Sequence, residues 1–247
     1  MHITEIYNKL DELYPFSAAE SFDNSGYVYI SENKEITKTV LCLDITDEVI
    51  NTAKEQGAQL IVCHHPLIFD GIKMLDEKRD ALYIKLVKYG ISAISLHTNF
   101  DVVENGLNEN CAAVIGIKGN NLYNENGIVY GDFGTEDLQN IALNIKNSLG
   151  VDRLRCFDSG KPVKTAALVC GAGFSFFESA AEKGIDLFIT GECKYHHFIK
   201  AKQYGISLID AGHFFTERIF SRVIEKPLSE MGIKTVIFED KLFYNEI

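Results

Sequence analysis

Short apolar runs alternate with amphipathic stretches along most of the chain, and this alternation constrains the fold more than any other feature. In the first half the apolar runs are residues 39–44, 60–63 and 91–96, and the stretches between them end at Gly57 and Gly90. Near-continuous apolar strands joined by helices are typical of a parallel sheet that is covered on both faces. The pattern therefore predicts an α/β fold.

The second half repeats this order of elements. Its predicted strands are residues 165–170, 186–190 and 206–210. The four residues at 89–92, Tyr-Gly-Ile-Ser, are identical to those at 204–207. We therefore predict two similar α/β domains related by internal duplication, with chance likeness of strand-helix units as the alternative. The polar stretch 118–127 lies between the halves, and it places the domains at 1–123 and 124–247.

Composition excludes several functional classes. The 247 residues carry a formal net charge of −11, which argues against a nucleic-acid partner because a phosphate backbone attracts a positive surface. No run approaches 18 apolar residues, so we expect no membrane span, and the first residues lack the features of a signal peptide. The six cysteines are scattered without a C-x-x-C motif. We therefore expect a soluble cytoplasmic protein with reduced thiols.

Six of the seven histidines follow a predicted strand or open the next helix. They are His64, His65, His97, His196, His197 and His213. Carboxylates accompany them: Glu192 follows the strand at 186–190, Asp101 lies four residues after His97, and Glu217 lies four residues after His213. Because ligand sites in parallel sheets form beyond the carboxyl ends of the strands, we expect these side chains to share one edge.

Imidazole and carboxylate groups are the ligand set of Zn, Fe, Mn and similar divalent ions. If a helix opens at His213, then Glu217 lies on the same helix face and the pair can chelate one ion. Pro66 ends the preceding strand, so the rings of His64 and His65 can both face inward. Several ligands that include two carboxylates suit two ions, and two ions suit hydrolysis because they acidify a bound water and neutralise a developing oxyanion.

The candidate residues fall into two groups. The predicted metal ligands are His64, His65, Asp101, His213 and Glu217. The catalytic candidates, which would transfer protons, are His97, Glu192, His196 and His197. Two alternatives stay open: the first group can form a polar rim without metal, and His196 and His197 can be structural or can support the ligands.

Weaker candidates lie in the same loops. Gly171-Ala172-Gly173 can seat a phosphate at a helix N-terminus, but the third glycine of a dinucleotide motif is missing, so a tight strand-helix turn is preferred. Cys63 and Cys193 lie near histidines and could act as nucleophiles, although packing is the preferred interpretation.

Six motifs in chain order resemble those of one family. They are Phe22-Asp23-Asn24-Ser25-Gly26, Leu43-Asp44-Ile45-Thr46, His64-His65-Pro66-Leu67-Ile68-Phe69, His97-Thr98-Asn99-Phe100-Asp101, Thr190-Gly191-Glu192 with His196-His197, and Gly212-His213-Phe214-Phe215-Thr216-Glu217. The chain thereby resembles the NIF-three-like family, whose members are also labelled GTP cyclohydrolase I type 2 homologues. The family commonly has Trp where Phe22 stands, and some members carry a long insert between the halves for which this chain has no room.

The resemblance implies a fold, a centre and an assembly. It implies two similar α/β domains around a cleft that holds a dinuclear metal centre, with Glu217 as the bridging ligand, and a toroidal homohexamer. It also implies a metal-dependent hydrolase that acts on a small molecule, a nucleotide or purine compound such as GTP. The competing hypothesis is a non-enzymatic metal-binding scaffold or metallochaperone. The net charge of −11 speaks against a third hypothesis, a regulatory partner of transcription proteins.

Overall fold

The structure, a computed structural model, describes residues 1–244, with the side chains of residues 119–122 excepted. The chain forms two compact units. The first contains Met1–Phe100 and the chain from Phe220 onward, and the second contains Asp101–Ile219. Within the described residues, every helix is too short or too polar to cross a membrane.

The first unit is built on a five-stranded sheet with the order β1-β4-β3-β2-β11. Its strands are β1 (Gly26–Tyr29), β2 (Lys38–Cys42), β3 (Leu60–Cys63), β4 (Ser92–Ser95) and β11 (Lys234–Ile237). Four of these strands are parallel, and β1 runs antiparallel to β4 at one edge. The mixed α/β fold that the apolar runs predict is therefore confirmed for this unit.

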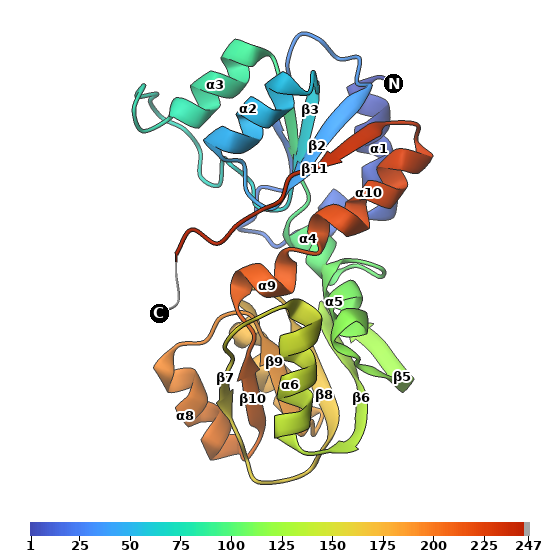
Figure 1. Cartoon of the computed structure of the whole chain (residues 1–247), viewed down its shortest axis with the longest axis vertical. Coiled ribbons are helices and arrows are strands. Elements are labelled where there is room, and N and C mark those ends of the chain that lie inside the picture. The colour runs from blue at the N-terminus through green and yellow to red at the C-terminus, as the bar shows by residue number, and fades with distance from the viewer. Residues whose placement is uncertain (245–247) are drawn as a thin grey trace. The chain divides into compact units, whose positions relative to one another are not determined.

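Helices cover both faces of this sheet. They are α1 (Ile3–Leu13), α2 (Asp47–Glu55), α3 (Ala81–Tyr89) and α10 (Phe220–Glu230), with a short 3-10 turn, η1 (Phe16–Ala18). Figure 1 shows α2 and α3 on one face and α1 and α10 on the other. Val49 and Leu86 belong to the same buried cluster as Val40 and Ile61, so the apolar stripes of α2 and α3 face the sheet.

The second unit contains a six-stranded sheet with the order β5-β6-β8-β9-β10-β7. Its strands are β5 (Lys118–Glu125), β6 (Ile128–Glu136), β7 (Arg155–Phe157), β8 (Val163–Val169), β9 (Leu187–Thr190) and β10 (Ser207–Asp210). β8, β9 and β10 are parallel, and the other pairings are antiparallel. The helical segments are α5 (Leu107–Ile115), α6 (Leu138–Leu149), η2 (Gly173–Phe176), α7 (Phe177–Glu182), α8 (Tyr195–Tyr204) and α9 (His213–Glu217). A further helix, α4 (Thr98–Val102), spans the change from the first unit to the second.

The two sheets share part of their strand order. In the first unit, helix α1 is followed by β1 and then by the parallel strands β2, β3 and β4, and β1 pairs antiparallel with β4. In the second unit, helix α6 is followed by β7 and then by the parallel strands β8, β9 and β10, and β7 pairs antiparallel with β10. The strand beside the first of the three parallel strands differs between the sheets: β11 pairs parallel with β2, whereas β6 pairs antiparallel with β8. The common order places the ends of three parallel strands at one edge of each unit.

Two features of the chain's organisation differ from the sequence-based expectation. The stretch 118–127, expected as a linker between domains, forms β5 and its turn to β6, because Asn126 and Gly127 both have the positive φ angles that a two-residue hairpin turn requires. The division at residue 123 is also not the one observed, since β11 pairs with β2 and brings the C-terminal segment into the first unit. Asp101, assigned to the first domain, falls in the second unit.

Candidate metal centre

Three histidines gather at the carboxyl ends of two neighbouring strands in the first unit. His64 and His65 follow β3, and His97 follows β4. The ring centroids of His64 and His65 are 4.9 Å apart, and that of His97 lies 5.1 Å and 5.5 Å from them. Each residue offers a ring nitrogen within 4.8 Å of the others, so this group could hold a metal ion. The sequence placed His97 among the catalytic candidates, and the structure brings it beside two predicted ligands.

Oxygen acceptors orient the rings of His64 and His65. Nδ1 of His64 lies 2.8 Å from the carbonyl oxygen of Leu96, and Nδ1 of His65 lies 2.9 Å from Oδ1 of Asp44. The tautomer that satisfies these contacts carries its proton on Nδ1 and its lone pair on Nε2. This arrangement is the usual one for metal-binding histidines, whose second nitrogen donates to a carboxylate or carbonyl group.

Asp23 orients His97 in the same way. Its Oδ1 lies 2.7 Å from Nδ1 of His97, while its Oδ2 accepts hydrogen bonds from the hydroxyls of Ser25 and Thr98, both at 2.6 Å. Burial alone would raise the pKa of Asp23, but the hydrogen bonds from His97, Ser25 and Thr98 outweigh it and hold this pKa well below its ordinary value. Asp23 is therefore a carboxylate at neutral pH. Two of the motifs, residues 22–26 and 97–101, meet at this hydrogen bond.

In the second unit a helix opens at His213, shortly after β10, which is the condition under which the four-residue spacing places Glu217 on the same helix face. Nε2 of His213 lies 3.0 Å from Oε2 of Glu217, so the pair has the separation of two ligands on one ion. Nδ1 of His213 lies 3.1 Å from Oε2 of Glu192. Glu192 thus orients His213 as Asp44 orients His65. The side chain of Glu217 is buried, whereas that of His213 is half-exposed.

Glycines let two loops approach this pair closely. Gly171 follows β8 and has a φ of +58°, and a Cβ atom on it would overlap Oε1 of Glu217 and lie 3.3 Å from Nε2 of His213. A Cβ atom on Gly191, beyond β9, would lie 2.8 Å from Cα of His213. The turn at Gly171 is tight, as the sequence pattern favours. A glycine is required there because the carboxylate of Glu217 on α9 leaves no space for a side chain. The sequence signal for this role was only a glycine directly after a strand.

Asp101 and Glu217 both lie close enough to the buried thiol of Cys170 to affect its titration. Burial raises the pKa of Cys170 well above its ordinary value, with further contributions from Cys111, Glu217 and Asp101. The carboxylates of Asp101 and Glu217 therefore act on the same thiol. Burial also raises the pKa of Cys193 to about 12 and that of Cys63 still further. Protonated thiols are poor nucleophiles, so packing is the better interpretation of Cys63 and Cys193.

His196 and His197 lie in the first turn of α8. The ring of His197 stacks on Phe174 with centroids 3.8 Å apart and an interplanar angle of 4°, and the ring of His196 meets that of His197 edge-on at 4.4 Å. Nδ1 of His197 accepts a hydrogen bond from the backbone N–H of Lys194 at 3.0 Å. These ring contacts fix the two histidines beside Glu192 in an open pocket.

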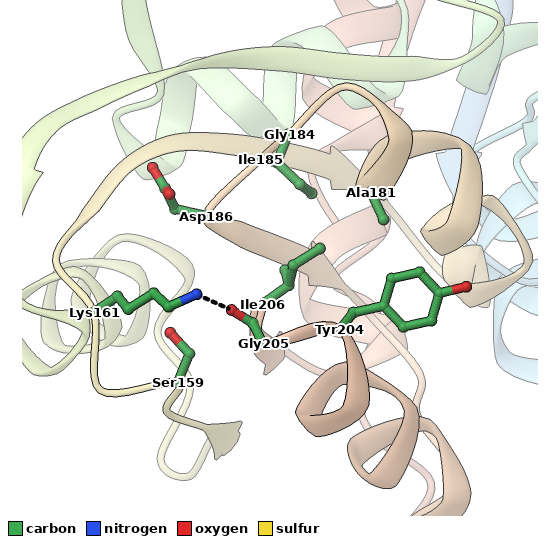
Figure 2. A pocket seen from close by; sticks show the side chains of 9 residues that line it. All are labelled: Ser159, Lys161, Ala181, Gly184, Ile185, Asp186, Tyr204, Gly205 and Ile206. Atoms are coloured by element: carbon green, nitrogen blue, oxygen red, sulfur yellow. Dashed lines mark hydrogen bonds between the residues drawn. The ribbon is translucent and has the colours of Figure 1, made fainter.

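A second cavity, of about 290 Å³, occurs at the opposite end of the same sheet. Its walls include Lys161, Asp186 and Tyr204, and Nζ of Lys161 donates to the carbonyl oxygen of Gly205 at 3.4 Å (Figure 2). Asp186 and Gly205 precede β9 and β10, so the cavity lies at the amino ends of these strands. None of the predicted site residues lines it. Ligands of parallel sheets bind beyond the carboxyl ends of the strands, so this cavity lies at the edge of the sheet opposite to the candidate ligand His213.

The residues at these edges fit a divalent cation. Four histidines, His64, His65, His97 and His213, have Nδ1 directed at an oxygen acceptor, so Nε2 is the ring nitrogen that could meet a metal ion or a reacting group. Glu217 adds a buried carboxylate in a space that glycine keeps open. Neutral imidazole with carboxylate suits Zn, Fe or Mn rather than Ca or Mg.

Comparison of the chain with known proteins identifies a matching family, similar sequences and a similar solved structure. Residues 1–241 match the family model described as Duf34/NIF3 (NGG1p interacting factor 3). The chain is 37% identical over 237 residues to a Helicobacter pylori protein named GTP cyclohydrolase 1 type 2, with 95% of each chain covered. A Clostridium perfringens homologue of that name is 37% identical over 239 residues, covering 92% of this chain and 91% of the relative. The crystal structure of Staphylococcus aureus protein SA1388 matches with a TM-score of 0.91 at 26% identity, covering 100% of this chain and 99% of that one.

Proposed function

Because the chain belongs to the Duf34/NIF3 family, we propose that it binds two divalent metal ions and hydrolyses a nucleotide or a related purine compound. The observation that carries this proposal is the common orientation of His64, His65, His97 and His213, each with Nδ1 facing an oxygen acceptor. Histidines that merely pack or cap need not share one orientation. The name of the Helicobacter pylori relative supports GTP as the first substrate to test.

The proposed ligands are the five residues that the sequence predicts. They are His64, His65, Asp101, His213 and Glu217. Glu217 is the proposed bridge, since its carboxylate has two oxygens and can hold one ion with each. When bound, the ions supply Lewis acidity to the reacting groups. Asp44 and Glu192 keep the rings of His65 and His213 oriented for ligation.

His97 is the proposed proton-transfer residue. Asp23 holds the proton of His97 on Nδ1, so Nε2 is the atom that accepts a proton from the attacking water and returns it to the leaving group. The carboxylate of Asp23 also stabilises the imidazolium that forms after proton uptake. Glu192, His196 and His197, the other catalytic candidates, line an open pocket in the second unit. Their proposed role is substrate binding.

The test is metal content followed by turnover. Protein purified without a polyhistidine tag is expected to contain two ions per chain by elemental analysis, and to hydrolyse GTP or one of a panel of phosphoesters only when metal is present. Protein stripped by a chelator and reloaded serves as the control. Absence of bound metal overturns the whole proposal. Two bound ions without any turnover overturn the hydrolase part and favour a metal-binding scaffold or metallochaperone.

We also propose the assembly and the origin of the chain. The family resemblance implies a ring-shaped homohexamer, so light scattering in moderate salt should give about six times 27.7 kDa. A monomer under these conditions overturns this. The strand order shared by β1–β4 and β7–β10, together with the identical residues at 89–92 and 204–207, supports an internal duplication.

A further inference from the structure

An open pocket of about 420 Å³ lies beside the candidate ligand His213 in the second unit. It is lined by Ala172, Phe174, Ser175, Glu192, Lys194 and His196, among others. Ala172 to Ser175 follow β8, and Glu192 and Lys194 follow β9, so the pocket sits at the carboxyl ends of these strands. Its volume falls within the range of small-molecule sites. We call it the rim pocket.

The rim pocket is rich in hydrogen-bond donors. Lys194 and Lys200 bring ammonium groups, Ser175 brings a hydroxyl, and His196 and His197 bring imidazole rings. Two carboxylates also line it, but both have partners: Glu178 pairs with Lys200, and Glu192 with His213. Among the described residues, Lys194 forms no ion pair. The two lysines and two glutamates of the pocket balance in charge, so the pocket offers a ligand the ammonium group of Lys194 together with neutral hydrogen-bond donors.

One of these donors is held in place. Stacking on Phe174 fixes the ring plane of His197, and the hydrogen bond from the backbone of Lys194 makes Nδ1 the acceptor. Burial lowers the pKa of His197, and the charges of His196, Lys194 and Lys200 lower it further, so the ring is neutral near pH 7. A neutral ring whose Nδ1 accepts carries its proton on Nε2. Nε2–H is thus a donor with a fixed direction.

Glu192 connects the rim pocket to the candidate metal ligands. Its side chain lines the pocket, and its Oε2 lies 3.1 Å from Nδ1 of His213. A molecule bound in the pocket would therefore lie one side chain away from His213. A subsite in this place can hold one end of a substrate while the other end reaches the metal ligands.

We propose that the rim pocket binds the phosphate groups of a phosphorylated substrate, with Lys194, His196 and the Nε2–H of His197 as donors. Lysine acts as a point charge for phosphate, and fixed neutral donors add direction to that attraction. This proposal rests on the proposed function in one respect only, namely that the phosphorylated substrate is a nucleotide. It also assigns His196 and His197 to substrate binding instead of proton transfer.

The test measures binding without turnover. Inorganic triphosphate, GTP and guanosine are titrated calorimetrically into the full-length protein as purified, and again after metal removal, which separates the pocket from direct metal–phosphate binding. Lys194→Gln and His196→Gln are the test variants. Lys202→Gln is the matched control, because Lys202 lies on the same helix, carries the same charge and does not line the pocket.

We expect Lys194→Gln to weaken triphosphate binding roughly tenfold or more with and without metal, since a charge-assisted contact is lost. His196→Gln should weaken it less, and Lys202→Gln should leave it within about twofold. Guanosine binding should not respond to Lys194→Gln. Equal triphosphate affinity in wild type and Lys194→Gln, or an equal loss in Lys202→Gln, overturns the inference. Failure of the proposed function looks different: triphosphate binding stays sensitive to Lys194, while metal-loaded wild type turns over nothing.

Discussion

A Cβ atom on Gly171 would overlap Oε1 of Glu217, so the loop beyond β8 and the carboxylate of α9 lie as close as a glycine allows. Gly171 also has a φ of +58°, a backbone conformation that other residues adopt only with strain. The position of Glu217 therefore depends on a residue 46 positions earlier that carries no functional group. This dependence can be tested by substitution at either end.

Gly171→Ala should displace the Glu217 carboxylate and lower metal content as well as stability. Gly184→Ala is the matched control, because Gly184 also has a positive φ, +73°, but a Cβ atom there meets nothing within 4 Å. Both variants should lose roughly 1–2 kcal/mol of unfolding free energy to backbone strain. Only Gly171→Ala should lose more than this and also lose metal in elemental analysis. Equal stability and equal metal content in the two variants would show that the close approach has no consequence.

Glu217→Ala should reduce bound metal from two ions toward one or none per chain. Without the shared anion, two nearby cations repel each other and at least one leaves. Glu182→Ala, at the end of α7 and exposed, removes the same charge far from the proposed ligands and should keep both ions. Elemental analysis of folded protein gives the result. Retention of two ions by Glu217→Ala contradicts the bridging role.

His97→Ala should retain most of the metal and lose most of the turnover, by roughly 10²–10⁴-fold, which is the usual contribution of proton transfer. Asp23→Asn should lower turnover in the same direction, because the neutral amide stabilises the imidazolium of His97 less well. Metal content is measured first and turnover second on the same preparations. Loss of metal in His97→Ala would place His97 among the ligands, as its distance from His64 and His65 also allows.

The stability of the first unit should depend on the titration of Asp240. Burial raises the pKa of this carboxyl from 3.8 to about 6, and the charge of Asp44 adds to the shift, while a hydrogen bond from the N–H of Leu43 opposes it. Because the folded-state pKa lies above the unfolded value, the stability contributed by protonation is complete below about pH 4. It is lost as the pH rises through about 6.

Asp240→Asn should therefore raise the stability at pH 8 more than at pH 4.5, by roughly 1–3 kcal/mol. The amide oxygen of the variant can still accept the hydrogen bond from Leu43. Chemical denaturation at the two pH values measures the difference, and Glu32→Gln, at an exposed position, serves as the control. An effect of Asp240→Asn that is the same at both pH values would contradict the shifted titration.

The sequence predicts the buried strands well. The predicted run 60–63 coincides with β3, and 186–190 and 206–210 extend β9 and β10 by one residue each. These strands are covered on both faces, so their apolar residues are continuous and the flanking polar residues mark their ends. The same logic predicts where the candidate site lies, because a histidine directly after a buried strand must lie at the carboxyl edge of a sheet.

Other features have no local signal. The strand β5 at the edge of its sheet is polar, so it looks like a linker, and only the turn at Asn126 and Gly127 identifies the hairpin. The roles of Asp23 and Asp44 depend on hydrogen bonds to His97 and His65, which are 74 and 21 residues away along the chain. Such pairings are set by tertiary packing, which residue spacing does not show.

The parallel pairing of β11 with β2 has a consequence for the order in which the protein is made. During synthesis the first hundred residues leave the ribosome early, yet their sheet lacks its last strand until Lys234–Ile237 emerge. Until then the edge of β2 is an unpaired row of backbone donors and acceptors, and the sheet also lacks α10. The second unit, which is continuous in sequence, can finish folding first. The part of the chain that is made first is therefore completed last.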